Sequence, residues 1–108
     1  DDKKFMRIAI AEARSSETPY GAVIVEEGQV VSRAGNTVQP DHDPTCHAEV
    51  NAIRQLTRQQ GESQPSGAYT LYSTCEPCAC VLRLLFGRVL PPSFMVSAWM
   101  ILLTAILI

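Results

Sequence analysis

Two short segments of the chain carry side chains that can bind a metal ion and move protons. His47 and Glu49 stand two residues apart, and Cys75 and Cys78 follow further along. Imidazole nitrogen and thiolate sulfur are ligands that zinc prefers, and a zinc ion with three protein ligands keeps a position for water, whose pKa falls to roughly 7. A carboxylate beside that water can take up a proton and deliver it elsewhere. Together the segments predict a hydrolytic zinc site with Glu49 as its acid and base.

Each half of this pattern has an ordinary structural explanation when it is taken alone. A histidine in a helix is more often a packing or surface residue than a ligand, and a carboxylate is favourable at any helix N-terminus. The cysteine pair alone is also compatible with redox activity or with a zinc ribbon. A ribbon needs a second cysteine or histidine pair, which the sequence lacks, and redox chemistry leaves the histidine and the glutamate unexplained. His42 is interpreted as a polar turn residue and Cys46 as buried filler.

The order of the predicted elements places both segments where a strand gives way to a helix. Hydrophobic periodicity and turn residues define these elements. They are a helix over residues 2–14, strands over residues 20–25 and 30–34, a loop over residues 35–44, a helix over residues 46–59 and a strand over residues 68–73. Thr45 is a candidate N-cap for the second helix, and Gly28 suits a tight turn because it tolerates a positive φ. The order predicts a three-layer α/β/α fold whose helices cover a mixed sheet.

Composition indicates one small domain in a reducing compartment. The chain has 108 residues, of which 46% are hydrophobic, enough for a core. A formal net charge of −2 gives no bulk attraction to nucleic acid. The cysteines cluster around the candidate site, which is typical of metal chemistry rather than of a disulfide framework. Because no secretory signal is visible at the charged start, we expect a cytoplasmic protein.

Several stretches resemble the cytidine deaminase-like superfamily, whose members are zinc-dependent base deaminases. The matching stretches are residues 19–23, 35–36, 43–45, 47–50, 52–54 and 71–78. They look most like the purine-directed branch, which includes guanine deaminase and tRNA adenosine deaminase. The resemblance implies a cytidine deaminase-like core over residues 1–80, whose fold is truncated or altered after the third strand. It also implies that His47 and Cys78 bind Zn²⁺ and that Glu49 shuttles protons from water to the ring and the leaving amine.

The resemblance further implies a reaction and a set of partners. Family members remove an exocyclic amine from a base by hydrolysis and release ammonia. Guanine or a related purine base or nucleoside is the first expectation, because Cys75 and the stretch 43–45 look most like guanine deaminase, and an adenosine of tRNA is second. Asn36, which alone is more often a turn former, and Ala48 are implied to contact the base. A homodimer is implied in the same way. The alternative of another class is a catalytically impaired zinc-binding or interaction module.

The sequence departs from the family pattern at the second cysteine of the Pro-Cys-x-x-Cys motif. Cys78 and Cys80 would lie roughly 200° apart on a helix, whereas the cysteines of the family motif share one face. Three outcomes stay open. The helix start distorts to admit Cys80 as a ligand, Cys75 takes its place, or zinc binding is impaired.

The last part of the chain, residues 81–108, is an atypical apolar tail whose only charges are Arg83 and Arg88. Reading the third base of each codon with the first two of the next allows Cys-Ala-Met-Cys after Pro77, and further along allows Tyr-Gly-Val-Ser-Met-Asp-Asp. Both look like family sequence, so we hypothesise that the tail is an out-of-frame translation. The competing interpretation is a membrane anchor over residues 89–108, which are uncharged and close to the roughly 20 residues of a bilayer span. Two prolines interrupt that stretch, so we favour the frameshift and expect no membrane attachment.

Overall fold

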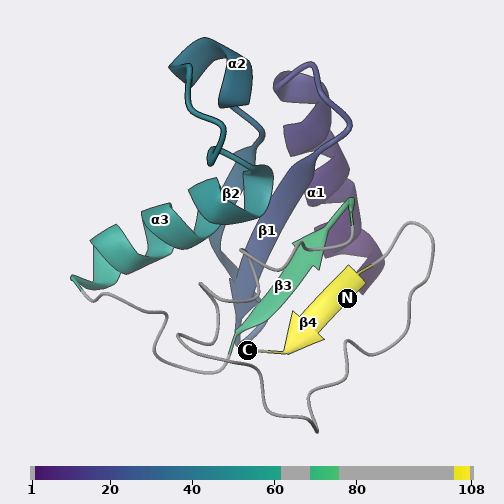
Figure 1. The fold of residues 1–108 in the computed structure, drawn as a ribbon. Coiled ribbons are helices and arrows are strands. Elements are labelled where there is room, and N and C mark those ends of the chain that lie inside the picture. Colours follow the sequence, from purple (N-terminus) through teal and green to yellow (C-terminus); the bar gives the residue numbers. More distant parts are fainter. Residues whose placement is uncertain (1, 62–68, 76–103, 108) are drawn as a thin grey trace, which may run out of the picture.

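β1 (Gly21–Glu26) is an inner strand of a four-stranded sheet, and the layers are built around it. This computed structural model describes residues 2–61, 69–75 and 104–107. The other strands are β2 (Gln29–Gly35), β3 (Thr70–Ser73) and β4 (Thr104–Leu107), and the helices are α1 (Asp2–Ser15), α2 (Val38–Asp41) and α3 (Ala48–Gln60). The strand order is β2-β1-β3-β4, with α1 against one face of the sheet and α3 against the other (Figure 1).

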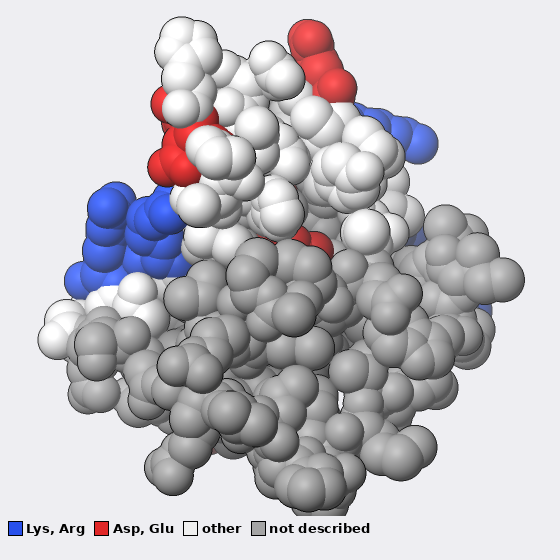
Figure 2. Space-filling view, viewed as in Figure 1, with Lys and Arg blue, Asp and Glu red and all other residues white. Residues whose placement is uncertain are grey.

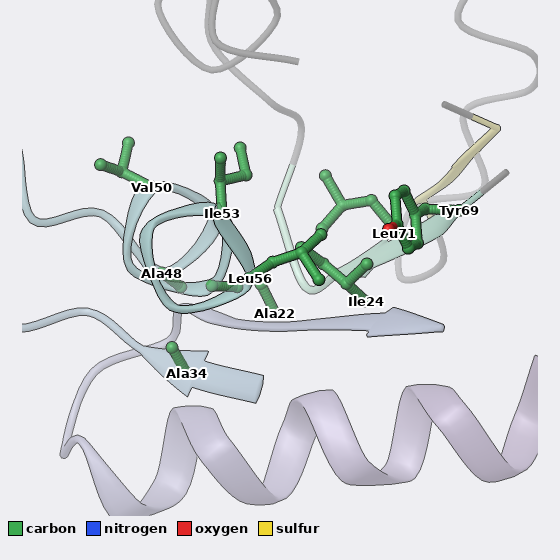
Figure 3. Packing of buried hydrophobic residues seen from close by; sticks show 10 residues of the cluster. Ala22, Ile24, Ala34, Ala48, Val50, Ile53, Leu56, Tyr69 and Leu71 are labelled. Carbon is green, nitrogen blue, oxygen red and sulfur yellow. The ribbon is translucent and has the colours of Figure 1, made fainter. Parts of the chain in front are cut away.

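Alternate residues of β1 face opposite layers, because successive side chains of a strand point to opposite sides. Ala22 and Ile24 belong to the buried cluster under α3 (Figure 3). Val23 and Val25 belong to a second buried cluster, which includes residues of α1. All four side chains are buried. The three-layer α/β/α arrangement is therefore confirmed.

A tight turn at Glu27 and Gly28 joins β1 to β2. Both residues have positive φ angles, 50° and 76°. A two-residue turn with two positive φ angles matches the twist of the flanking strands. Glycine adopts this conformation without a steric penalty, so the role predicted for Gly28 is confirmed.

The segment between β2 and α3 differs from the prediction in two places. Residues 38–41 form the short helix α2 inside the region predicted as a loop, and His42 ends it with a φ of 51°. α3 begins at Ala48, with His47 rather than Thr45 as its N-cap. The Thr45 hydroxyl donates instead to Asp43 Oδ1 at 2.6 Å, so it stabilises the turn before the helix.

The sheet also extends beyond the expected core. Every pairing among the described strands is antiparallel, so this part of the chain shows only the antiparallel component of the predicted mixed sheet. β4 comes from the apolar tail and pairs with β3 from Thr70↔Leu107 to Ser73↔Thr104. The fold was predicted to be truncated or altered after the third strand. An uncharged segment can pair with an open sheet edge through its backbone alone.

Candidate active site

The start of α3 is held by a turn that begins at Asp43. Its Oδ1 accepts hydrogen bonds from the backbone N–H of Thr45 at 2.8 Å and from the Thr45 hydroxyl. These bonds, first the one from the hydroxyl, hold the pKa of Asp43 below its usual value. The turn delivers His47 to the N-cap position with φ −66° and ψ 157°, where its carbonyl accepts from Asn51 N–H at 2.9 Å. His47 is half-buried, and its side chain makes no cap hydrogen bond.

The side chain of Asn51 ties this turn to the end of β2. Its Nδ2 donates to Gly35 O at 3.0 Å, to Thr37 Oγ1 at 2.8 Å and to Cys46 O at 3.3 Å. The N–H of Thr37 also donates to Cys46 O at 2.9 Å. The sequence analysis missed Asn51. Its signal was an asparagine near the start of a helix, because asparagine is a poor helix former and needs another reason to be there.

Glu49 is a buried carboxylate in the first turn of α3, with 5% of its surface exposed. Oε1 accepts a hydrogen bond from Ser73 Oγ at 2.5 Å, and Ser73 is the last residue of β3. Ser73 Oγ in turn accepts from the backbone N–H of Cys75 at 3.2 Å. A chain of hydrogen bonds therefore joins the segment after β3 to the start of α3. The sequence predicted that both chemical segments lie where a strand gives way to a helix.

Of the two residues implied to contact the base, one follows β2 and the other is the first residue of α3. Asn36 follows β2, and its Oδ1 accepts from Val38 N–H at 3.0 Å, as expected of a turn former. Among the described residues its amide Nδ2 has no recorded acceptor, so this group can donate to a ligand. The side chain of Ala48 is fully buried in the cluster under α3. Because no part of Ala48 is exposed, its implied contact with a base stays a prediction.

Of the three candidate cysteine ligands, only Cys75 is among the described residues. Cys75 follows β3, is half-buried and forms no disulfide. Cys78 and Cys80 lie outside the described residues, and within those residues no three histidine, cysteine or acidic side chains are grouped closely enough to hold a metal ion. The imidazole of His47 and the thiol of Cys75 are of the types that zinc takes, and the buried carboxylate of Glu49 accepts a hydrogen bond from Ser73, two residues before Cys75. The chemistry of these donors fits zinc.

Cys46 confirms the interpretation as buried filler. Its side chain is 3% exposed, and its Sγ accepts from Arg54 Nη1 at 3.6 Å. The same guanidinium nitrogen donates to Asn51 Oδ1 at 3.1 Å. Cys46 thus packs behind the turn that carries His47.

An open cavity of about 430 Å³ lies between β2 and α3. Arg33, Arg54 and Arg58 line it, together with the acidic residues Glu12 and Asp41. Figure 2 shows basic side chains gathered over α3 and acidic ones over the region of α2. Arg33 is paired with Glu12, which leaves the cavity only a small excess of positive charge.

Comparison with known proteins defines the class of this domain. Residues 1–85 match the model of the cytidine and deoxycytidylate deaminase zinc-binding region. The chain belongs to this family, as the motifs around His47 and Cys75 predicted. None of the described helices is long and apolar enough to cross a bilayer.

Two of the individual relatives bear the names of purine deaminases. The chain is 41% identical over 90 residues to a tRNA-specific adenosine deaminase of Agrobacterium fabrum, a match that covers 79% of this chain and 59% of the relative. It is also 41% identical over 68 residues to the guanine deaminase of Bacillus subtilis, covering 63% of this chain and 43% of that protein. The chain therefore spans about three fifths or less of the length of these relatives.

Two solved structures share the fold. The structure of guanine deaminase from Bacillus subtilis has a TM-score of 0.73 and 34% identity, with 80% of this chain and 57% of that chain covered. A structure from a study of A-to-I editing by tRNA:A34 deaminases has a TM-score of 0.68 and 38% identity, with 73% of this chain and 63% of that chain covered. The cytidine deaminase-like fold class is confirmed.

Proposed function

We propose that this chain is a hydrolytic deaminase that acts on a purine base and depends on Zn²⁺. The observation that carries the proposal is the carboxylate of Glu49, which is 5% exposed and lies in the first turn of the helix that His47 caps. Burial of a carboxylate is costly, and such groups gather at functional sites. Membership of a zinc-binding deaminase family supports the same chemistry.

The proposed site residues have two roles, binding zinc and transferring protons. His47 and Cys78 are the proposed zinc ligands, and either Cys75 or Cys80 is the third. When bound, zinc acidifies water and makes it a nucleophile near neutral pH. Glu49 takes a proton from the attacking water and returns protons to a ring nitrogen and to the leaving amine. The exocyclic C–N bond breaks, a carbonyl forms at the same carbon, and ammonia leaves.

The first proposed substrate is guanine or a related purine. The residues that support it are Cys75 and the turn at Asp43, which resemble guanine deaminase. An adenosine of tRNA is the second candidate. Its support is the match to a tRNA-specific adenosine deaminase, which covers 79% of this chain against 63% for the match to guanine deaminase. Ammonia release from guanine supports the first ranking. Activity that is confined to a tRNA stem-loop reverses it.

The test of the reaction is the isosteric change Glu49→Gln. We expect turnover to fall by about a hundredfold or more, because general acid–base catalysis contributes roughly 10²–10⁴. Bound zinc, measured by elemental analysis, is expected to stay unchanged because Glu49 is not a ligand. Glu27→Gln, in the turn between β1 and β2, is the matched control and keeps full activity. Zinc bound in stoichiometric amount without turnover of any base would establish the non-catalytic module instead.

A further inference from the structure

The hydrogen bond between Ser73 and Glu49 is built from two buried groups. Ser73 is 1% exposed and Glu49 is 5% exposed. The Ser73 hydroxyl has one proton, which it donates to Glu49 Oε1, and the hydroxyl oxygen itself accepts from the Cys75 N–H. A charge-assisted hydrogen bond of this kind is roughly twice as strong as a neutral one. Ser73 therefore fixes one oxygen of the carboxylate.

The position of Ser73 is itself fixed by the sheet. Its Cα pairs with Ala22 on β1. The next residue, Thr74, accepts from Gly21 N–H at 3.0 Å and donates to Pro19 O at 2.7 Å through its hydroxyl. Successive side chains at this strand end thus hold α3 on one side and the start of β1 on the other. The sheet is a rigid reference for the Ser73 hydroxyl.

The second carboxylate oxygen of Glu49 has a different environment. Among the described residues, Oε1 receives the Ser73 hydroxyl and Oε2 has no recorded donor. The carboxylate of Glu49 therefore cannot rotate to exchange Oε1 and Oε2 without breaking the hydrogen bond to Ser73. One oxygen is anchored, and the other is left for proton transfer.

We propose that Ser73 is a positioning residue for the proton shuttle Glu49. Its hydrogen bond to Oε1 orients the carboxylate so that Oε2 faces the reacting water and base. This inference rests on the proposed function. The Cys75 N–H, which donates to the same hydroxyl, couples the orientation of Glu49 to the backbone that leads into the cysteine motif. One side chain, that of Ser73, thereby fixes the position of the Glu49 carboxylate relative to the proposed metal-binding segment.

The test compares side chains of equal shape in the zinc-loaded full chain that releases ammonia. Ser73→Val and Ser73→Thr differ only in a methyl group against a hydroxyl. We expect Ser73→Val and Ser73→Ala to lower kcat about tenfold to hundredfold with KM changed less than about threefold, because a misplaced catalytic group costs rate rather than binding. Ser73→Thr is expected to restore most of the kcat that Ser73→Val loses.

A readout that needs no turnover is hydrogen exchange at the Cys75 amide. Removal of its acceptor in Ser73→Ala is expected to speed exchange about tenfold or more, and Ser73→Thr is expected to preserve protection. Ser32→Ala is the matched control, because Ser32 is also a buried serine of the sheet, 4% exposed, and donates to Ala52 O of α3 at 2.7 Å. It is expected to leave both kcat and Cys75 exchange unchanged.

The outcomes separate the inference from the proposed function. If the parent chain deaminates a purine and Ser73→Val matches Ser73→Thr in kcat, the positioning role is wrong while the function stands. If Ser32→Ala lowers kcat as much as Ser73→Ala, the effect is one of general stability and the inference is again wrong. If the parent chain releases ammonia from no purine, the proposed function fails and the role of Ser73 fails with it.

Discussion

Ser73 and Asn51 act through single hydrogen-bonding groups that a sequence pattern does not reveal. His47 and Glu49 could be chosen from the sequence because they stand two residues apart and a cysteine cluster follows further along the chain. A serine at the end of a strand and an asparagine in a helix occur in many proteins with no such role. Only the observed register shows that Ser73 reaches Glu49 and that Asn51 reaches Gly35.

Tyr72 provides a residue-level prediction about pH. Burial, followed by the hydrogen bond to Asp2, raises the pKa of Tyr72 from its usual value near 10 to about 12. The fold therefore favours the protonated phenol, so this contribution to stability is complete below about pH 10 and is lost as the pH rises toward about 12. We expect Tyr72→Phe to cost about 1 kcal/mol at pH 7 and to flatten the alkaline decline in stability.

Urea denaturation at a series of pH values checks this expectation. Tyr20→Phe is the control, since Tyr20 is 41% exposed. It should follow the wild-type curve throughout. Parallel stability curves for Tyr72→Phe and the wild type would show that the phenol does not titrate with folding.

At the level of elements, the spacing of apolar residues predicted which face of a helix is buried. The buried residues Val50, Ile53 and Leu56 lie on one face of α3, as their spacing indicated. The periodicity could not locate the helix start, because the N-cap is chosen by the turn at Asp43 and by the Asn51 side chain. α2 was missed for a similar reason. Its four residues are too few to show a period, and Asn36 defines its start by a single hydrogen bond.

The contact between α1 and β1 gives an element-level prediction. A Cβ at Gly21 would overlap the carbonyl oxygen of Ala9 and lie 2.6 Å from Ala13 N. These are backbone atoms that cannot rotate away, so we expect Gly21→Ala to destabilise the fold by about 3 kcal/mol. Gly61 is the comparison, because it has open space around it and a φ of 71°.

The two glycines separate crowding from backbone conformation. Gly61→Ala should cost only about 1 kcal/mol, through its left-handed conformation alone. Denaturation midpoints of the two variants measure the difference. Equal losses of stability would mean that α1 can shift away from the sheet and that the close approach is not a constraint.

At the level of the whole molecule, the sequence predicted the layers and the family but not the last strand. The order of the predicted elements and the motif residues carried those predictions, because both can be recognised from local sequence patterns. The pairing of β4 with β3 joins residues that are far apart in the chain and leaves no local pattern. The match to the deaminase family ends at residue 85, so the tail has no family template to guide it.

The final prediction concerns the spacing of Cys78 and Cys80 and the frame of the tail. Restoring one base after the Cys78 codon allows Cys-Ala-Met-Cys, whose cysteines share one helix face, so we expect the repaired chain to hold about one zinc ion after dialysis and the given chain to hold less.

Cys75→Ser distinguishes the open alternatives. If Cys75 serves as the third ligand, the change removes zinc from the given chain and leaves the repaired chain loaded. Elemental analysis of the four proteins measures this, and sequencing of the coding DNA across Cys78 tests the frame directly. Equal zinc content in the given and repaired chains, or an intact reading frame with no plausible missing base, would overturn the account of the tail.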